Sequence, residues 1–301
     1  MKNKKSLYII TMIVFGSIGL FVRNIPLPSG QIALVRGVIG CIFLLAMCPI
    51  TKQKISMRAI RSNLLLLIIS GAAIGFNWIL LFEAYKYTSI ANATLSYYFA
   101  PVFIILLSPI YLKERLTLTK VISIVGAIIG MFLIAGSKGE SGSNDILGIG
   151  YGLIAAVLYA GVVIMNKFLK NLSGIETTVI QLGAASIVLM PYILLTQSLQ
   201  VFSLERKALL LLLIVGIIHT GLAYLMYFTA IKNLNGHTIA VFSYMDPISA
   251  ILLSVLLLNE RMGILQVAGA CLILGASFAN EWFDRRIQKR EKAMGVCKEE
   301  L

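Results

Sequence analysis

Long apolar stretches alternate with short polar connections along almost the whole chain. A helix needs about 20 apolar residues to cross the hydrocarbon core of a bilayer. Boundaries placed at charged residues, Pro and Gly give ten such stretches, and we therefore predict an all-α polytopic membrane protein with ten transmembrane helices. The predicted spans are residues 6–22, 31–49, 63–86, 91–112, 118–136, 146–166, 176–196, 208–231, 237–258 and 262–280.

Composition supports the membrane interpretation. Hydrophobic residues make up 58% of the 301 residues and charged residues only 13%, whereas a soluble domain carries roughly 25% charged residues. A water-soluble fold could not hide that much apolar area, because most of a globular surface must face water. We therefore expect the chain to be surrounded by the lipid bilayer.

An internal repeat indicates how the helices are arranged. Residues 72–115 recur as residues 218–261, at an offset of 146 positions. Ten helices then divide into five plus five, and an odd number per repeat inserts the two halves in opposite orientations. The sequence predicts two inverted five-helix repeats around a central cavity, as in many transporters. The matching pairs are Gly75/Gly221, Phe82/Phe228, Ala84/Ala230, Lys86/Lys232, Tyr98/Tyr244, Pro101/Pro247, Leu112/Leu258 and Glu114-Arg115/Glu260-Arg261.

The repeat also predicts the domain boundaries. We assign residues 1–136 to the first five-helix repeat and residues 146–280 to the second. Residues 137–145 (SKGESGSND) are polar and rich in Gly and Ser, as expected of a linker. Residues 281–301 carry several Lys and Arg residues, and we expect them to form a basic cytoplasmic tail.

The distribution of basic residues predicts the orientation. With the N-terminus inside, 19 of the 26 Lys and Arg residues fall in cytoplasmic segments, six fall on the opposite side, and Arg36 lies within a span. This bias satisfies the positive-inside rule for ten helices with both termini cytoplasmic. We predict a multi-pass protein of a bacterial-type cell (inner) membrane. The net charge of +13 serves orientation, and we expect no nucleic-acid partner.

One pattern occurs in both repeats and resembles a known family. An apolar helix is followed by a helix with a central proline, which closes on Glu-Arg. This pattern resembles the EamA family of the drug/metabolite transporter superfamily, over about residues 6–280, and Arg36 also suits it. The resemblance implies inverted repeats, a central cavity and transport of small metabolites, usually export. The residues that carry it are Phe82-x-Ala84, Pro101-Val102, Lys113-Glu114-Arg115, Phe228-x-Ala230, Asp246-Pro247 and Asn259-Glu260-Arg261.

Asp246 lies ten residues into the ninth span, near the middle of the membrane. A carboxylate is costly at that depth and is a candidate functional group. It could couple transport to protons, pair with a cationic group of the substrate, or contact Arg36 and nearby hydroxyls structurally. The first repeat has Ala100 at the matching position, which favours a specific role. Pro247 and its repeat mate Pro101 each remove a backbone donor, so we expect a kink in both helices.

Polar aromatic and amide side chains lie in the central parts of the third, fourth, eighth and ninth spans. Aromatic residues usually form belts at the membrane interfaces, and rings this deep with polar tips need partners. They could line a cavity for a small amphipathic molecule, or simply pack between helices. His219 could relay protons, bind substrate or be a hydrogen-bonded core residue. The candidate substrate-binding residues are Asn77, Trp78, Tyr97, Tyr98, His219, Tyr224, Tyr244 and Asp246.

Charged residues elsewhere receive a structural interpretation. Side chains at span ends can reach the interface, so we expect Glu114-Arg115 and Glu260-Arg261 to cap helices, form local ion pairs and fix tight turns. Arg36 lies about five residues into the second span. It could reach outward, pair with a carboxylate or attract an anion, and we expect a structural role for it.

Sequence motifs for other chemistry are missing. There is no G-x-x-x-x-G-K-[ST] loop, so we expect no direct use of ATP. No cluster has metal-ligand spacing, and we expect neither a metal nor another cofactor. A membrane-embedded enzyme would need a nucleophile and base grouped together, which the two histidines and scattered carboxylates do not offer.

These observations together predict a secondary active transporter. We expect export of a small metabolite, amino acid or drug-like solute by alternating access, with Asp246 as the candidate for proton coupling. A lipid flippase and a non-transporting membrane scaffold are the alternatives. The protein could be a monomer or a homodimer.

Overall fold

The computed structural model of the protein describes residues 2–52, 55–113, 116–136, 145–231, 234 and 236–293. Within these ranges every regular element is a helix. Glu114 and Arg115, most of the predicted linker, and residues 294–301 of the predicted tail lie outside the described residues.

The helices follow the predicted spans, with three interruptions. The first half contains α1 (Lys2–Arg23), α2 (Ser29–Ile50), α3 (Met57–Ser62), α4 (Leu64–Tyr87), α5 (Ile90–Tyr97), α6 (Ala100–Tyr111) and α7 (Leu118–Gly136). The second half contains α8 (Asp145–Lys167), α9 (Gly174–Thr196), the 3-10 turn η1 (Val201–Ser203), α10 (Arg206–Gly216), the π-helix η2 (Ile217–Leu222), α11 (Ala223–Ile231), α12 (Gly236–Ser243), α13 (Met245–Leu258) and α14 (Ile264–Ala293). The fourth, eighth and ninth spans are therefore each built from more than one helical segment.

Nine helical segments of the described chain are long and apolar enough to cross a membrane. A tenth apolar segment, Ile264–Ala279, is shorter and forms the first part of α14. The chain is thus an all-helical membrane protein with nine to ten apolar helices, which confirms the prediction from the hydrophobic pattern.

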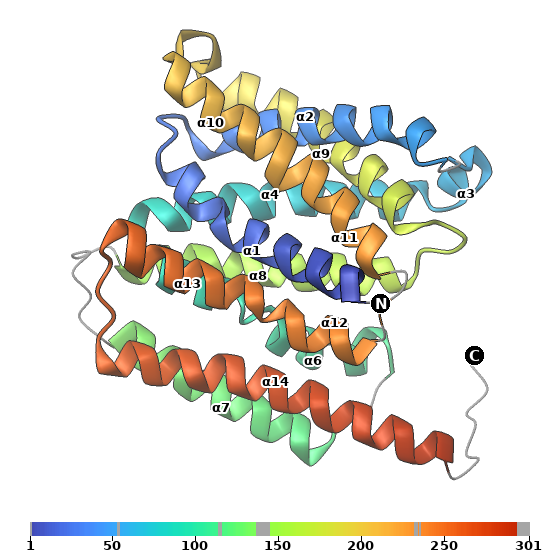
Figure 1. The fold of residues 1–301 in the computed structure, drawn as a ribbon, viewed down its shortest axis with the longest axis vertical. Helices are drawn as coiled ribbons and strands as arrows, with labels where there is room; N and C mark the ends of the chain where they lie inside the picture. Colours follow the sequence, from blue (N-terminus) through green and yellow to red (C-terminus); the bar gives the residue numbers. More distant parts are fainter. Residues whose placement is uncertain are drawn as a thin grey trace.

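The helices run side by side, and the start of α1 and the end of α14 lie at the same end of the bundle (Figure 1). We call this the terminal end. The connections from α1 to α2, from α4 to α5 and from α13 to α14 lie at the opposite end, which we call the distal end (Figure 1). At the centre, α4 packs against α8 and α9, and α2 packs against α9.

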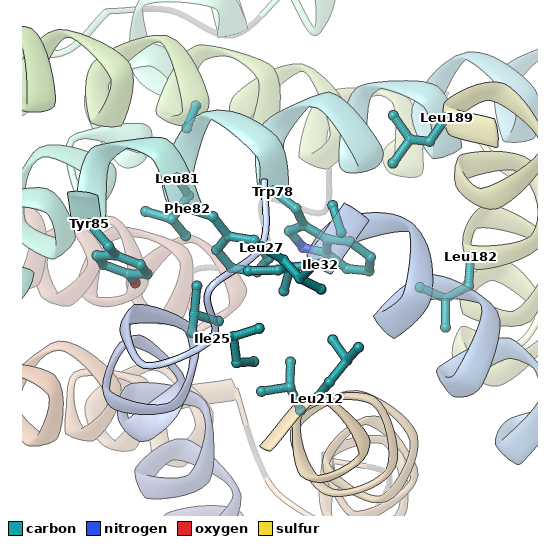
Figure 2. Packing of buried hydrophobic residues seen from close by; sticks show 14 of the residues in the cluster. Ile25, Leu27, Ile32, Trp78, Leu81, Phe82, Tyr85, Leu182, Leu189 and Leu212 are labelled. Carbon is teal, nitrogen blue, oxygen red and sulfur yellow. The ribbon is translucent and has the colours of Figure 1, made fainter. Parts of the chain in front are cut away.

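The main core lies where α2 and α4 meet the connection between α1 and α2. Leu27, Ile32, Trp78 and Phe82 point toward one another there and are all buried (Figure 2). Since lipid tails are as apolar as these side chains, close packing rather than exclusion of water holds such helices together. Small residues allow that packing, and a Cβ added at Gly71 would lie 2.6 Å from the carbonyl oxygen of Gln181.

The last helices of the two halves form a separate pair. α7 and α14 lie side by side at the bottom of Figure 1 and pack mainly on each other. They cross at two glycines, because a Cβ at Gly269 would lie 2.5 Å from the carbonyl oxygen of Gly130. Such close backbone approach is what small residues permit in membrane helices.

The two ends of the bundle differ in packing. At the distal end, α5 packs against α13, and all residues from Ile90 to Ser96 are buried. The repeat mate of α5 is α12, near the terminal end. Of the α12 side chains that the structure describes, only Thr238 is buried, and α12 has no comparable packing against α6 in the described chain. In the described chain, α5 at the distal end is therefore more closely packed than α12 at the terminal end.

Candidate functional site

Two helix breaks lie at corresponding places in the two halves. The fourth span is interrupted at Tyr98 and Phe99, and the ninth is interrupted at Tyr244. Pro101 and Pro247 follow these breaks by three residues or fewer and lie in the first turns of α6 and α13. Proline is tolerated there because first-turn N–H groups have no acceptor within the helix. At these breaks, backbone N–H and C=O groups are released from the helical hydrogen-bond pattern, and the neighbouring side chains lie at membrane depth.

The two breaks are joined by a hydrogen bond. The hydroxyl of Tyr98, from the first half, donates to Oδ2 of Asp246, from the second half, over 2.7 Å. Asp246 is half-buried and belongs to no ion pair within the described chain. A carboxylate at this depth without a cationic partner is the most unusual group in the fold.

Two further tyrosines lie beside Tyr98. The ring centroid of Tyr97 lies 6.3 Å from that of Tyr98 and 5.4 Å from that of Tyr159. Tyr159, on α8, was missed by the sequence reasoning. That reasoning started from aromatic residues at matching positions of the two repeats, such as Trp78 and Tyr224, whereas the mate of Tyr159 is Ile13. The sequence feature that could have identified Tyr159 is a polar aromatic residue in the middle of a predicted span.

Arg36 lies inside the protein and does not reach the interface. Its side chain is buried, and its guanidinium carbon lies 3.9 Å from the centroid of the Trp78 ring and 5.4 Å from that of Phe82. Such a position over an aromatic face is a cation–π contact. Its Nε donates to the hydroxyl of Thr220 over 3.1 Å. No carboxylate in the described chain pairs with it.

The π-helix η2 positions two polar side chains. The hydroxyl of Thr220 donates to the carbonyl of Val215, five residues earlier, which is the spacing of a π-helix. His219 is buried, and its Nε2 lies 3.0 Å from the hydroxyl of Ser17. Its ring contacts Phe21 at a centroid distance of 4.6 Å. The π-turn thus directs Thr220 to Arg36 and His219 to α1.

The other candidate residues divide between the site and the helix packing. The ring centroid of Tyr224 lies 5.5 Å from that of Phe15. The amide of Asn77 donates to the backbone carbonyl of Ala155 over 2.6 Å and so ties α4 to α8. Tyr244 instead packs edge-to-face on Phe278 of α14, so the structure does not bring it to its repeat mate Tyr98.

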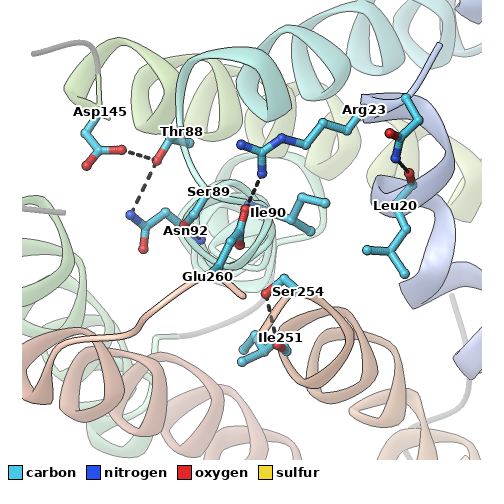
Figure 3. Close-up of polar contacts among 11 residues, drawn as sticks. Leu20, Arg23, Thr88, Ser89, Ile90, Asn92, Asp145, Ile251, Ser254 and Glu260 are labelled. Atoms are coloured by element: carbon cyan, nitrogen blue, oxygen red, sulfur yellow. Dashed lines mark hydrogen bonds and ion pairs between the residues drawn. The ribbon is translucent and has the colours of Figure 1, made fainter. Parts of the chain in front are cut away.

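A polar cluster closes the distal end (Figure 3). Glu260 forms an ion pair with Arg23 and accepts a hydrogen bond from the backbone N–H of Ile90 over 3.1 Å. It thereby links the end of α1, the start of α5 and the end of α13. Nearby, the hydroxyl of Thr88 donates to Asp145 at the start of α8. The ion pair of Glu260 is long-range, whereas the sequence predicted a local one.

We expect Glu260→Ala to loosen the distal end. An exposed ion pair contributes at most about 1 kcal/mol, but the hydrogen bond from Ile90 to a charged acceptor adds about 1.5–3 kcal/mol. Hydrogen–deuterium exchange of residues 88–97 should therefore accelerate, and less so in Glu260→Gln, which keeps an acceptor. Glu83→Gln is the matched control, because the ion pair that the described chain shows for Glu83 is with the neighbouring Lys86. Unchanged exchange in Glu260→Ala would show that the cluster does not hold this end closed.

Comparison with known proteins decides the family. The family model of the EamA-like transporters matches residues 5–136 and 146–280. The chain belongs to the EamA-like transporter family. It is 32% identical over 272 residues to the uncharacterized transporter YxxF of Bacillus subtilis (strain 168), covering 88% of this chain and 85% of that one. It is 26% identical over 241 residues to protein RarD of Escherichia coli (strain K12), covering 78% and 79%.

A solved structure supports the fold of this EamA-like transporter. That crystal structure shares 15% sequence identity and superposes with a TM-score of 0.64, covering 94% of this chain and 99% of that one. Membership in the EamA-like family makes the protein a multi-pass membrane transporter, not an enzyme. The two matched segments imply repeated halves, and a transporter implies a small-molecule substrate.

Proposed function

We propose that this EamA-like transporter is a secondary active exporter that exchanges a small solute for protons at Asp246. The observation that carries the proposal is the hydrogen bond from Tyr98 to Asp246, which joins the helix breaks of the two halves. A carboxylate at membrane depth can hold either a proton or a cationic group, but not both at once. Because the proton and the solute compete for the same carboxylate, the flux of one in one direction drives the flux of the other in the opposite direction.

Alternating access requires that one end of the bundle faces the cytoplasm and that the other end faces outward. The connections at the terminal end and the two termini carry most of the Lys and Arg residues, so we place that end in the cytoplasm. The distal end, closed by α5 on α13 and by Glu260, then faces outward. Under this proposal the protein is in an inward-facing state, and Asp246 is reached from the cytoplasm.

The proposal is tested on the full-length protein in proteoliposomes that contain a pH-sensitive dye. Amino acids, nucleobases and quaternary organic cations are added singly, without an imposed gradient. We expect at least one of them to drive proton movement that depends on the protein. If solutes enter the vesicles through the protein but no solute moves protons, coupling at Asp246 is wrong. If the pH responds to none of the three classes and none of them enters, the proposal fails entirely.

A further inference from the structure

A basic connection lies at the terminal end of the bundle, between α2 and α4 (Figure 1). Residues 51–63 (TKQKISMRAIRSN) hold four Lys or Arg residues and no acidic residue. The connection contains the short helix α3, and it joins a membrane span that ends at Ile50 to one that begins at Leu64. Since spans end at the border of the hydrocarbon core, α3 lies at the depth of the lipid headgroups.

One side of α3 faces the protein and the other faces outward. Ala59 and Ile60 are buried, whereas Arg58 and Arg61 are exposed. Helical residues three positions apart are neighbours on one face, so these two guanidinium groups share the outer side of α3. The ion pairs of the described chain include neither of them. The outer side of α3 therefore presents two cations to an anion from outside the protein.

The connection between α8 and α9 adds a third cation to this side. The side-chain amide of Asn63 donates to the backbone carbonyl of Lys170 over 2.9 Å, and the backbone N–H of Lys170 donates to Oδ1 of Asn63 over 3.1 Å. Lys170 is exposed and lies next to the end of α3. We call Arg58, Arg61 and Lys170 the basic surface. It is built from both halves of the chain.

Glu176 contacts both connections, but its charge is used within the protein. One of its carboxylate oxygens accepts a hydrogen bond from the backbone N–H of Ser56 over 2.7 Å, and the other accepts one from the backbone N–H of Ser173 over 2.8 Å. Glu176 is buried. These bonds fix the two connections to each other, and the basic surface keeps its positive charge.

Apolar side chains border the basic surface. Met57, Leu65 and Phe168 are 62%, 72% and 44% exposed. Met57 precedes Arg58, Leu65 lies in the first turn of α4, and Phe168 lies two residues before Lys170. Cations beside exposed apolar side chains match a phospholipid, which carries a phosphate next to its acyl chains. A small soluble anion would satisfy the charges and leave the apolar side chains uncovered.

We propose that the basic surface is a binding site for an anionic phospholipid of the phosphatidylglycerol type. The phosphate binds Arg58 and Arg61 from the first half and Lys170 from the second, and the acyl chains lie along Leu65 and Phe168. Arginine suits this role because its planar guanidinium matches the oxygens of a phosphate. The bound lipid bridges the two connections. The site is separate from Asp246, and the inference depends neither on the solute nor on the direction of transport.

The test is native mass spectrometry of the purified full-length protein in a neutral detergent. Phosphatidylglycerol and phosphatidylcholine with the same acyl chains are added at equal concentrations, and the first bound lipid is quantified. We expect phosphatidylglycerol to bind at least about tenfold more tightly, since several Lys and Arg residues attract its net charge. Inorganic phosphate at the same concentration should not displace it, because phosphate lacks the acyl chains.

The variant that carries both Arg58→Gln and Arg61→Gln should lose this preference. Both residues are exposed, so we expect the melting temperature without lipid to stay as in the wild type, which shows that the variant folds. The matched control carries Lys4→Gln and Lys5→Gln, which remove the same charge from the first turn of α1, at the same end of the bundle. The control should keep the preference for phosphatidylglycerol.

Three results would overturn the inference. The first is equal binding of the two lipids. The second is an equal loss of preference in both double variants, because attraction would then follow the net charge and not this surface. The third is displacement of the lipid by inorganic phosphate, which would make the surface a site for small anions.

Discussion

Asp246→Asn is expected to abolish uphill transport while leaving downhill exchange in place. The Asn side chain can still accept the hydrogen bond of Tyr98, so the junction between the two halves should persist. It cannot take up and release a proton, so a pH gradient no longer drives the solute. One-to-one exchange allows about tenfold accumulation for each pH unit. In the variant, the accumulation measured in proteoliposomes should fall to equality across the membrane.

Asp145→Asn is the matched control for this experiment. Asp145 is also a carboxylate hydrogen-bonded to a hydroxyl, but it lies at the distal end, at the start of α8. We expect it to keep gradient-driven accumulation. If Asp246→Asn accumulates solute as the wild type does, the proton is carried elsewhere and Asp246 has another role.

Gly269→Ala is expected to cost the largest amount of stability among small substitutions in α14. The added Cβ would lie 2.5 Å from the carbonyl oxygen of Gly130 and 2.7 Å from the Ile134 side chain. The first of these is a backbone atom, which cannot move aside without separating α7 from α14. Overpacking of this kind typically costs about 1–3 kcal/mol. The midpoint of denaturant unfolding of the purified protein should fall accordingly.

Gly275→Ala is the control on the same helix. No heavy atom lies within 4 Å of the position where its Cβ would be placed. Since Ala is a better helix former than Gly, this variant should be neutral or more stable by about 0.5–1 kcal/mol. Equal midpoints for the two variants would mean that α7 and α14 do not depend on their close crossing.

The sequence predicted the spans well because lipid imposes a simple rule. Every backbone group in the hydrocarbon core must be bonded internally, so long apolar runs become helices. The same rule does not locate interruptions. The prolines Pro101 and Pro247 did indicate the breaks in the fourth and ninth spans, but nothing in the local sequence indicated the π-helix at Ile217–Leu222, whose Thr220 contacts Arg36 of α2. Contacts between distant segments are not contained in a local pattern.

The site was predicted in part for a related reason. Repeat equivalence selected Tyr98 and Tyr224, but it could not select Tyr159, whose mate Ile13 is apolar. The sequence likewise offered Glu260 a neighbouring partner, whereas its ion-pair partner Arg23 lies 237 positions away. For Arg36, the sequence could not show the lack of an ion-pair partner in the described chain, because this requires the positions of all the neighbouring side chains.

The difference in packing between α5 and α12 has a consequence for the opposite state. If each half adopted the conformation of the other, α12 would dock on α6, α5 would leave α13, and the cluster of Glu260 would come apart. This change requires no new fold, because equivalent residues of the two halves would make equivalent contacts at the opposite end of the bundle. The two end states should then be nearly equal in energy, and the residues that differ between the halves would decide which one predominates.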